Sequence, residues 1–257
     1  MIFYMGGFGN VSFQALHARE LKIRYHSTFF LKKHVQNITK QSSQNIDVMK
    51  YVNVSTKYTK FEFILIGLLF IDFLIALVIR KSLITELDTR KVKCSPLLKP
   101  YLYFGYFQET AKLHELSTNR IVNIELDQNC QNDVIYCHFR GGDFVEHGMV
   151  PNTDFLIKSV EHFPSNIKSI QILTQDYKYF QSNILIPDGF SVNHSPGSFE
   201  ADYATLANAK YYIGSASTYG TLAFFETEKC KIGVLPNDFF SQFKNIEHQD
   251  AKKVFVA

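Results

Sequence analysis

Short apolar runs alternate with segments of helical spacing along the second half of the chain. A run of about four to eight apolar residues bounded by turn residues is typical of a buried strand, whereas apolar residues three and four positions apart indicate a helix. The predicted strands are the start of Val134–Phe144, Ser169–Thr174, Phe190–Asn193, Tyr211–Gly214 and Lys231–Leu235, and the predicted helices are Thr153–Phe163, Asp202–Ala209 and Thr218–Phe225. This alternation predicts βα units and an α/β fold with a mostly parallel sheet.

The beginning of the chain carries the same pattern in one copy. Met1–Met5 is predicted to be a buried strand, Gly6–Asn10 a glycine loop and Ser12–Ile23 a helix. A strand, a glycine loop and a helix form half of a nucleotide-binding unit in general terms. The dinucleotide fingerprint is not matched, because a serine stands where its third glycine belongs. The loop is therefore either a close approach to a ligand or an ordinary tight turn, and its polar residues are Asn10 and Gln14.

The apolar segment Phe63–Ile79 raises the question of a membrane span. A spanning helix needs about 20 apolar residues, and a central carboxylate costs about 2.5–3.5 kcal/mol on insertion scales. The segment is slightly short and carries Asp72 in its middle, so it is interpreted as buried core, with a membrane-dipping segment as the alternative. The polar stretch Ser117–Asp133 then separates two halves, and we expect domains at 1–120 and 121–257.

Composition narrows the class of protein. With 46% hydrophobic and 20% charged residues the chain is globular, and 27 basic against 24 acidic residues give a net charge of +3. That charge forms no basic stripe for nucleic acid, yet it tolerates an anionic ligand or association with a membrane surface. The four cysteines are scattered without metal-ligand spacing, and the first residues run straight into glycines instead of a signal peptide. We therefore expect a cytoplasmic chain with reduced thiols, with attachment to a membrane surface as the alternative.

The candidate chemistry begins in Val134–Phe144, where an apolar run ends in two glycines between an arginine and an aspartate. In an open α/β sheet, ligands gather where strands end in loops. The guanidinium of Arg140 can bind a phosphate with two parallel hydrogen bonds, and the glycines let the backbone approach a ligand closely. The alternative is a surface pair of Arg140 with Asp143. His138 is interpreted mainly as a packed histidine that orients the loop.

A second candidate site lies at the junction between the predicted strand Tyr211–Gly214 and the helix after it. Helix N-termini leave N–H groups unpaired and carry partial positive charge, so Ser217 or Thr218 there could bind a phosphate or could simply cap the helix. Asp202 is either the N-cap of its own helix or an acceptor for the N–H donors of a guanine. Glu200-Ala201-Asp202 also resembles a D-x-D metal motif, but no other acidic cluster supports a metal, and Asp176 is interpreted as a loop-capping residue.

Four segments, in order along nearly the whole chain, resemble motifs of the α-1,2-fucosyltransferases, glycosyltransferase family 11. Gly6–Gln14 is similar to that family's opening Gly-Gly-Leu-Gly-Asn-Gln-x-Phe-Gln, and Tyr103–Gln108 to its Leu-Asp-Gly-Tyr-Trp-Gln segment. His138–Phe144 is similar to its His-x-Arg-Arg-x-Asp-Tyr motif. Asp202–Tyr219 resembles its Asp-x-x-x-Leu-Met-Ser-x-Cys…Asn-Ser-Thr-Phe-Ser block.

The resemblance implies a GT-B-like fold of two Rossmann-type halves, with GDP-fucose in the cleft and the acceptor glycan largely on the first half. It implies that Arg140 holds the β-phosphate, that Asp202 contacts guanine, and that inverting transfer to a glycan or lipid-linked oligosaccharide needs no metal. The other binding residues that it implies are Gly7, Gly9, Asn10, Gln14, His138, Ser217 and Thr218. Asp143 and then Glu146 are the candidates for the carboxylate that deprotonates the acceptor hydroxyl.

The chain departs from the family pattern at two motifs. Gly141 stands where the second arginine belongs, and Gly220-Thr221-Leu222 replaces a Ser-Trp-Trp sequence in a chain without tryptophan. Two alternatives therefore stay open beside the fucosyltransferase. One is a related transferase with a different nucleotide-sugar donor, and the other is a non-catalytic protein that binds GDP or a glycan. A hydrolase is not indicated, because no Ser–His–Asp or G-x-S-x-G arrangement is present.

Overall fold

The computed structural model of the protein describes residues 2–3, 7–20, 26–27, 48–52, 64, 67, 122–126, 130–146, 148–194, 197–226, 231–236, 248–249 and 252–256. These residues fall into two compact units, the first ending at 67 but including 122–123, and the second beginning at 124. The segment resembling a family motif at Tyr103–Gln108 and all but two residues of Phe63–Ile79 lie outside the described residues. Within them, no helix combines the length and the apolar composition needed to cross a bilayer.

The first unit contains one long helix, α1 (Phe8–Glu20), which is buried along most of its length. Short strands β1 (Ile2–Phe3) and β2 (His26–Ser27) pair in parallel, and a single turn, α3 (Val48–Tyr51), leads into an antiparallel bridge between Val52 and Val122. The predicted glycine loop is wrong at Gly9 and Asn10, which lie in the first turn of α1. Helical hydrogen bonding already begins where the Val11 amide donates to the carbonyl of Gly7, at 3.1 Å.

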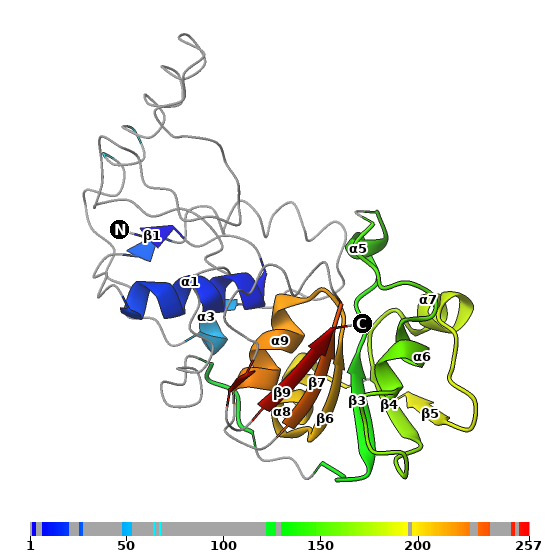
Figure 1. The fold of residues 1–257 in the computed structure, drawn as a ribbon. Coiled ribbons are helices and arrows are strands. Elements are labelled where there is room, and N and C mark those ends of the chain that lie inside the picture. The colour runs from blue at the N-terminus through cyan, green and yellow to red at the C-terminus, as the bar shows by residue number, and fades with distance from the viewer. Residues whose placement is uncertain are drawn as a thin grey trace. The chain divides into compact units, whose positions relative to one another are not determined.

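The second unit is an α/β domain built on one sheet with the strand order β5-β4-β3-β6-β7-β9-β8 (Figure 1). The bounds are β3 (Val134–His138), β4 (Ser169–Leu173), β5 (Ser191–His194), β6 (Tyr211–Gly214), β7 (Lys231–Leu235), β8 (His248–Gln249) and β9 (Lys252–Val256). Every pairing is parallel except that of β8 with β9. The predicted α/β class and the five predicted strands of this half are confirmed.

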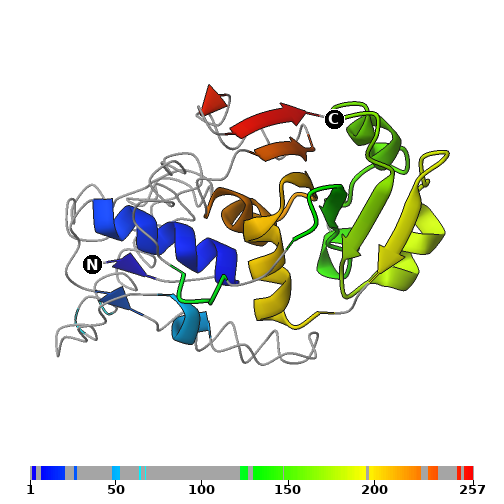
Figure 2. The ribbon, with the colours of Figure 1, turned by 90° about the horizontal axis from the view of Figure 1, so that it is seen from below.

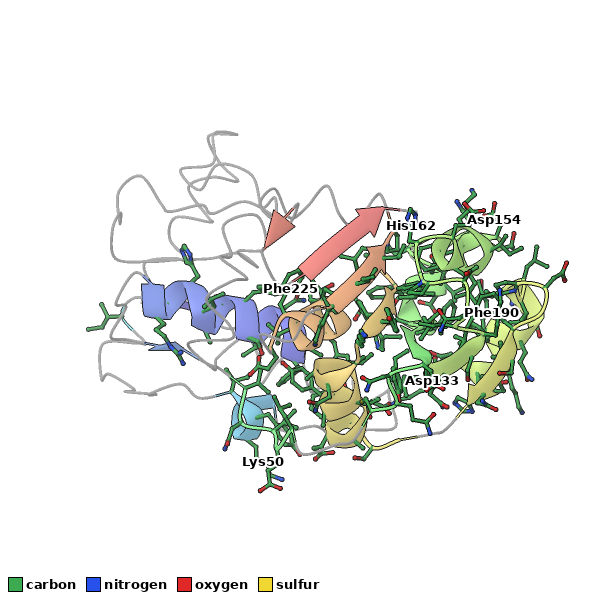
Figure 3. The ribbon with its side chains drawn as sticks, turned by 60° about the horizontal axis from the view of Figure 1, so that its bottom comes forward. Lys50, Asp133, Asp154, His162, Phe190 and Phe225 are labelled. Carbon is green, nitrogen blue, oxygen red and sulfur yellow. The ribbon has the colours of Figure 1, made fainter. Side chains whose placement is uncertain are left out.

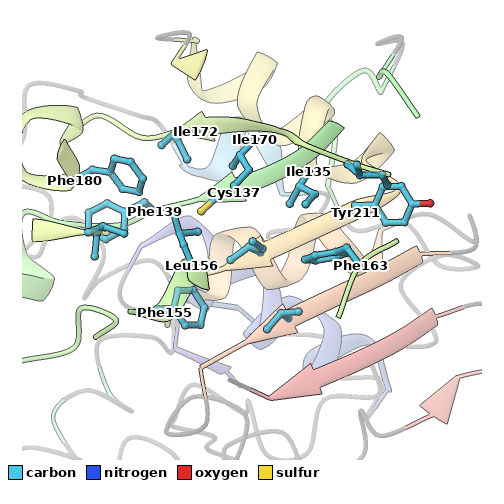
Figure 4. Close-up of a cluster of buried hydrophobic side chains, with 14 residues drawn as sticks. Ile135, Cys137, Phe139, Phe155, Leu156, Phe163, Ile170, Ile172, Phe180 and Tyr211 are labelled. Atoms are coloured by element: carbon cyan, nitrogen blue, oxygen red, sulfur yellow. The ribbon is translucent and has the colours of Figure 1, made fainter. Parts of the chain in front are cut away.

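Helices cover both faces of this sheet (Figure 2). Successive strand residues point to opposite sides, so each face packs its own set of side chains against the helices. On one face, α6 (Phe155–Val160) and α7 (Tyr177–Asn183) pack on a wholly apolar cluster (Figure 4). On the other face, α8 (Phe199–Asn208) packs against α9 (Thr218–Phe225), and Phe224 of α9 stacks on Tyr212 of β6 with 5.0 Å between ring centroids. A short helix, α5 (Asp143–Glu146), follows β3.

The apolar cluster consists of strand residues such as Ile135 and Ile170, both fully buried, and of helix residues such as Leu156 and Phe180. Phe180 lies 5.4 Å from Phe139 in an edge-to-face arrangement, a favourable geometry for aromatic pairs. Continuous apolar runs are what a parallel sheet covered on both faces requires. This is why the sequence pattern predicted these strands well.

The opposite face contains buried polar groups. Lys231, the first residue of β7, is 1% exposed, and its ammonium donates to the carbonyl oxygens of Ala207 and Phe224. Those carbonyls lie at the C-terminal ends of α8 and α9, where a cation is favoured by the helix dipole. The hydroxyl of Tyr203 donates to a carboxylate oxygen of Glu226 at 3.2 Å.

Three sequence-based predictions about this unit are corrected by the structure. Lys231–Leu235 does not close the strand set, because β9 pairs with β7 in parallel. Helix α8 begins at Phe199 and not at Asp202. The N-cap of α8 is Ser198, whose side chain accepts from the Ala201 amide at 3.2 Å, so Asp202 does not cap the helix.

Candidate functional site

The order in which successive strands are added to the sheet changes side between the parallel neighbours β3 and β6. Taken in chain order, the first five strands of the second unit lie in the order 3-2-1-4-5, so successive connections run one way from β3 and the other way from β6. Loops at such a switch point separate, and the carboxyl ends of the two strands form the usual crevice for a ligand in doubly wound sheets. The fold therefore singles out the loops after His138 and after Gly214.

A single serine joins these two loops. The Ser215 amide donates to the carbonyl of His138 at 3.0 Å, and the Ser215 hydroxyl accepts from the Arg140 amide at 3.1 Å. Ser215 is 1% exposed, so both bonds are shielded from water. The backbone at Arg140 is thereby fixed against the end of β6. Sequence reasoning concentrated on the hydroxyl residues further on and missed Ser215, although its place directly after a buried strand could have indicated it.

Arg140 itself is exposed at the end of β3. Its guanidinium carbon lies 4.7 Å above the centroid of the Phe144 ring, in a cation–π arrangement. The side chain therefore combines a fixed backbone with a permanently charged, planar donor group at the switch point. Such a group can bind a phosphate in two-point fashion.

The glycine pair after Arg140 packs against Asp176 at the end of the neighbouring strand β4. A Cβ on Gly141 would lie 2.8 Å from the Asp176 Cβ and 3.1 Å from its Oδ2. Gly142 adopts a φ of 53°, which an L side chain rarely tolerates. Where the family pattern has a second arginine, this chain therefore places a carboxylate instead. Asp176 occupies the N-cap position of α7 without a side-chain cap bond.

His138 lies between the two loops, and its ring centroid is 5.2 Å from that of Tyr219. Burial and the neighbouring charge of Arg140 lower the pKa of His138 to about 3, so the imidazole is neutral at physiological pH. Its Nδ1 is buried and has no hydrogen-bond partner in the described part of the chain. The residue thus packs against the loops as predicted, and its protonation state is fixed by its surroundings.

The start of α9 lies at the end of β6, on the same edge of the sheet. Ser217 occupies the N-cap position, is 2% exposed and makes no side-chain cap hydrogen bond, so the simple capping interpretation of its hydroxyl is wrong. The backbone carbonyl of Ser217 instead accepts from the amide and the hydroxyl of Thr221, at 3.2 and 3.1 Å. Thr218, the first helical residue, is half-buried.

Asp202 lies in the first turn of α8, beside the loop that contains Gly197. Burial raises the pKa of Asp202 to about 6, and the charge of His194 partly opposes that shift. His194 lies at the end of β5 and stacks on Tyr177 with 4.0 Å between ring centroids. Tyr219 connects Asp202's helix to the switch point, since its hydroxyl donates to the carbonyl of Phe199 at 2.7 Å.

The structure therefore brings His138, Arg140, Ser217 and Thr218 to one edge of the sheet, with α8 joined to it through Tyr219. Glu146 is exposed at the end of α5, and the backbone of Asp143 begins that helix, while its side chain lies outside the described part of the chain. Gly7, Gly9, Asn10 and Gln14 belong to the first unit, where Gly7 precedes α1 and is exposed, and Gln14 is fully buried. The described residues contain no group of three potential metal ligands.

The chain was compared with protein-family models. The model described as glycosyl transferase family 11 matches residues 69–255, which is well over half of the chain and takes in the described strands and helices of the second unit up to the last residue but one of β9. A search of curated proteins and a search of solved structures found no match.

Proposed function

Because this chain belongs to glycosyl transferase family 11 and is a fucosyltransferase-like glycosyltransferase, we propose that it transfers fucose from GDP-fucose to a hydroxyl of a glycan or lipid-linked oligosaccharide, with inversion at the anomeric carbon. The observation that carries this proposal is the edge of the sheet between β3 and β6. There a charged guanidinium, two loops joined by Ser215 and the N-terminus of α9 lie together. Such groups suit a diphosphate.

In this proposal the donor occupies the second unit. Arg140 binds the β-phosphate, His138 donates a hydrogen bond to it, and the start of α9 with Ser217 and Thr218 supports the pyrophosphate. Asp202, as a carboxylate, accepts the N1–H and N2–H donors of guanine. A charged carboxylate is the form that can accept both of these donors, and a carboxyl group with a pKa near 6 is largely charged at neutral pH.

The transfer step forms one bond and breaks one. The acceptor oxygen attacks the anomeric carbon, the bond from that carbon to the β-phosphate oxygen breaks, and GDP leaves with the electron pair. Arg140 and the dipole of α9 stabilise the charge that develops on the leaving phosphate, so that the mechanism needs no metal. The proton of the acceptor hydroxyl passes to a carboxylate, Asp143 in the first instance and Glu146 in the second.

The fold in this proposal is GT-B-like, with residues 1–120 as the acceptor-side domain and 121–257 as the donor-binding domain. Gly7, Gly9, Asn10 and Gln14 are the binding residues that the first domain contributes in this proposal. The protein acts in the cytoplasm, peripheral to the membrane if its acceptor is lipid-linked.

One observation favours a second candidate function, a related transferase with another donor sugar or a non-catalytic binding protein. The carboxylate of Asp176 lies against Gly141, where a family arginine would add a positive charge. Carboxylates accept hydrogen bonds from sugar hydroxyls and repel a diphosphate. A site with one cation fewer and a carboxylate in its place would prefer a different donor from a site that follows the family pattern.

Titration calorimetry with GDP, GDP-fucose and UDP tests the proposal directly. We expect GDP and GDP-fucose to bind and UDP to bind at least tenfold more weakly, and we expect fucosylated product to form with a panel of glycan acceptors. Arg140→Ala should weaken GDP binding about 100-fold, in keeping with the 2–3 kcal/mol of a charge-assisted hydrogen bond.

Lys158→Ala is the matched control for Arg140→Ala. Lys158 is an exposed cation on α6 and pairs at 2.9 Å with Asp154, which points outward from the domain (Figure 3). Its removal should leave GDP affinity unchanged. Equal effects of the two substitutions would mean that only overall charge matters, and turnover of a different sugar nucleotide would replace the fucose assignment by the second candidate.

A further inference from the structure

Two buried polar atoms below the switch point have no hydrogen-bond partner among the residues that the structure describes. They are the hydroxyl of Tyr212, on β6, and the Nδ1 of His138, on β3. These strands are neighbours, with Tyr136 opposite Tyr212 and His138 opposite Gly214 in the register. Tyr212 is fully buried, so water from outside does not reach its hydroxyl. An unpaired buried donor and an unpaired buried acceptor are each unfavourable.

The two atoms lie close to a common position. A Cβ built on Gly220 would lie 2.9 Å from the His138 Nδ1 and would also contact the Tyr212 hydroxyl, and a Cβ on Gly214 would lie 2.5 Å from that hydroxyl. The two atoms are therefore at most about 5–6 Å apart. One water can bridge this distance with two hydrogen bonds. Glycines at 214 and 220 provide the space that this pair occupies.

The chemistry of the pair favours one direction for the hydrogen bond. Burial, with a smaller contribution from Cys137, raises the pKa of Tyr212 well above its usual value of 10, so its phenol stays protonated and can donate. The imidazole of His138 is neutral, because its pKa is about 3. A neutral imidazole has one donor and one acceptor nitrogen, and the hydrogen bond at one nitrogen determines which tautomer is present.

We propose that Tyr212 is a positioning residue that donates a hydrogen bond to Nδ1 of His138 through one enclosed water, and so holds His138 in the tautomer that carries its proton on Nε2. His138 is half-buried as a residue, and its Nδ1, but not its Nε2, is a buried ring nitrogen without a hydrogen-bond partner among the described residues. The Nε2–H can then donate to the diphosphate of the donor. This role rests on the proposed function, because it assumes that a nucleotide diphosphate binds at this edge.

The tautomer can be measured without any ligand. In protein labelled with ¹⁵N-histidine, long-range ¹H–¹⁵N correlation spectra distinguish a protonated ring nitrogen from an unprotonated one. For His138 we expect an unprotonated Nδ1 and a protonated Nε2, and we expect Tyr212→Phe to shift both resonances towards the values of a mixed population. Tyr211→Phe is the matched control, because Tyr211 is the preceding residue of β6 and faces the apolar cluster. A His138 with its proton on Nδ1, or no shift in Tyr212→Phe, overturns the proposal.

The consequence for binding is tested by a double-mutant cycle. Tyr212→Phe should weaken GDP binding about tenfold, whereas His138→Gln retains a donor near the Nε2 position and removes any dependence on tautomer. Tyr212→Phe should therefore have no further effect in the His138→Gln background. Equal losses in both backgrounds would show that Tyr212 acts only through packing and would overturn the positioning role. If GDP fails to bind even the natural protein, the proposed function fails, while the spectra still decide the hydrogen bond.

Discussion

The two faces of the sheet in the second unit are built on different principles. Beneath α6 and α7, the buried contacts come from a continuous apolar cluster. Beneath α8 and α9, the buried surface includes the ammonium of Lys231, the Tyr203–Glu226 hydrogen bond and the unpaired hydroxyl of Tyr212. Apolar contacts stabilise the fold without a directional requirement, whereas buried polar groups stabilise it only when correctly paired. One face therefore supports the sheet, and the other also places groups for binding.

The largest expected effect comes from damage to the apolar face. Phe180→Ala should lower the free energy of unfolding by about 3–5 kcal/mol, because Phe180 is 1% exposed and contacts Phe139 and Tyr177. Chemical denaturation measures the loss, and GDP affinity of the remaining folded protein should not change.

Phe190→Ala is the control for this comparison. Phe190 is half-buried at the surface, with the Lys168 ammonium 4.6 Å from its ring centroid, so its truncation should cost much less. If Phe180→Ala instead weakened GDP binding strongly, the contribution of the apolar face to stability would not be independent of binding.

A smaller loss of stability is expected in the loop after β3, which carries Arg140. Gly141→Ala should destabilise the protein by about 1–3 kcal/mol, because the added methyl group would lie 2.8 Å from the Asp176 Cβ. Asp176→Gly in the same chain should relieve most of that cost, as measured by denaturation of the single and double variants. Gly7→Ala, where a Cβ would meet no atom of the described residues within 4 Å, should be close to neutral. Independent, additive losses from Gly141→Ala and Asp176→Gly would contradict the contact.

The smallest effect concerns Asp202 and depends on pH. Its pKa in the folded protein, about 6, lies above the value of 3.8 for an ordinary aspartate, so the folded state binds the proton more tightly than the unfolded state. The carboxyl group therefore favours the fold below pH 4, and this contribution is lost as pH rises through 6. Asp202→Asn should be more stable than the natural protein above pH 6, by about 1 kcal/mol after allowance for partial exposure.

Binding should show the opposite dependence on Asp202. GDP affinity should fall as pH drops below 6, where the carboxyl is protonated, and Asp202→Asn should weaken GDP binding at pH 7.5 and remove this dependence. Calorimetry between pH 5 and 8 measures it. An affinity that stays constant across this range in the natural protein would exclude Asp202 from guanine recognition.

Much of the second unit could be predicted from sequence, for physical reasons. Strands buried on both faces appear as apolar runs, as β3 and β6 do, while β4 keeps apolar residues at its buried positions, beside the polar Ser169 and Gln171. β9 was not predicted, because the strand begins with Lys252 and Lys253 and only a short apolar run follows them. The start of α1 was misplaced because this helix is buried on nearly every side, so no polar face marks its first turn, and its glycine suggested a loop.

The candidate site could be predicted only in part. Arg140, Ser217 and Thr218 follow strands directly, so local sequence indicated them. Asp176 and Tyr212 lie near the candidate site because β4 and β6 are the neighbours of β3 in the sheet. A single sequence does not determine that strand order. The N-cap prediction for Asp202 was wrong, because Ser198 caps α8 and the sequence pattern did not extend the helix back to it.

The ammonium of Lys231 has a consequence for how this chain can evolve. It secures the C-terminal ends of α8 and α9 at the start of β7, while the loops that follow β3 and β6 lie at the opposite ends of their strands. The anchoring of the two helices is thus separate from the residues that would contact a donor. Substitutions in those loops, for example at Arg140, leave the anchor of the two helices in place. Divergence in substrate preference is then open to a lineage that keeps one buried lysine.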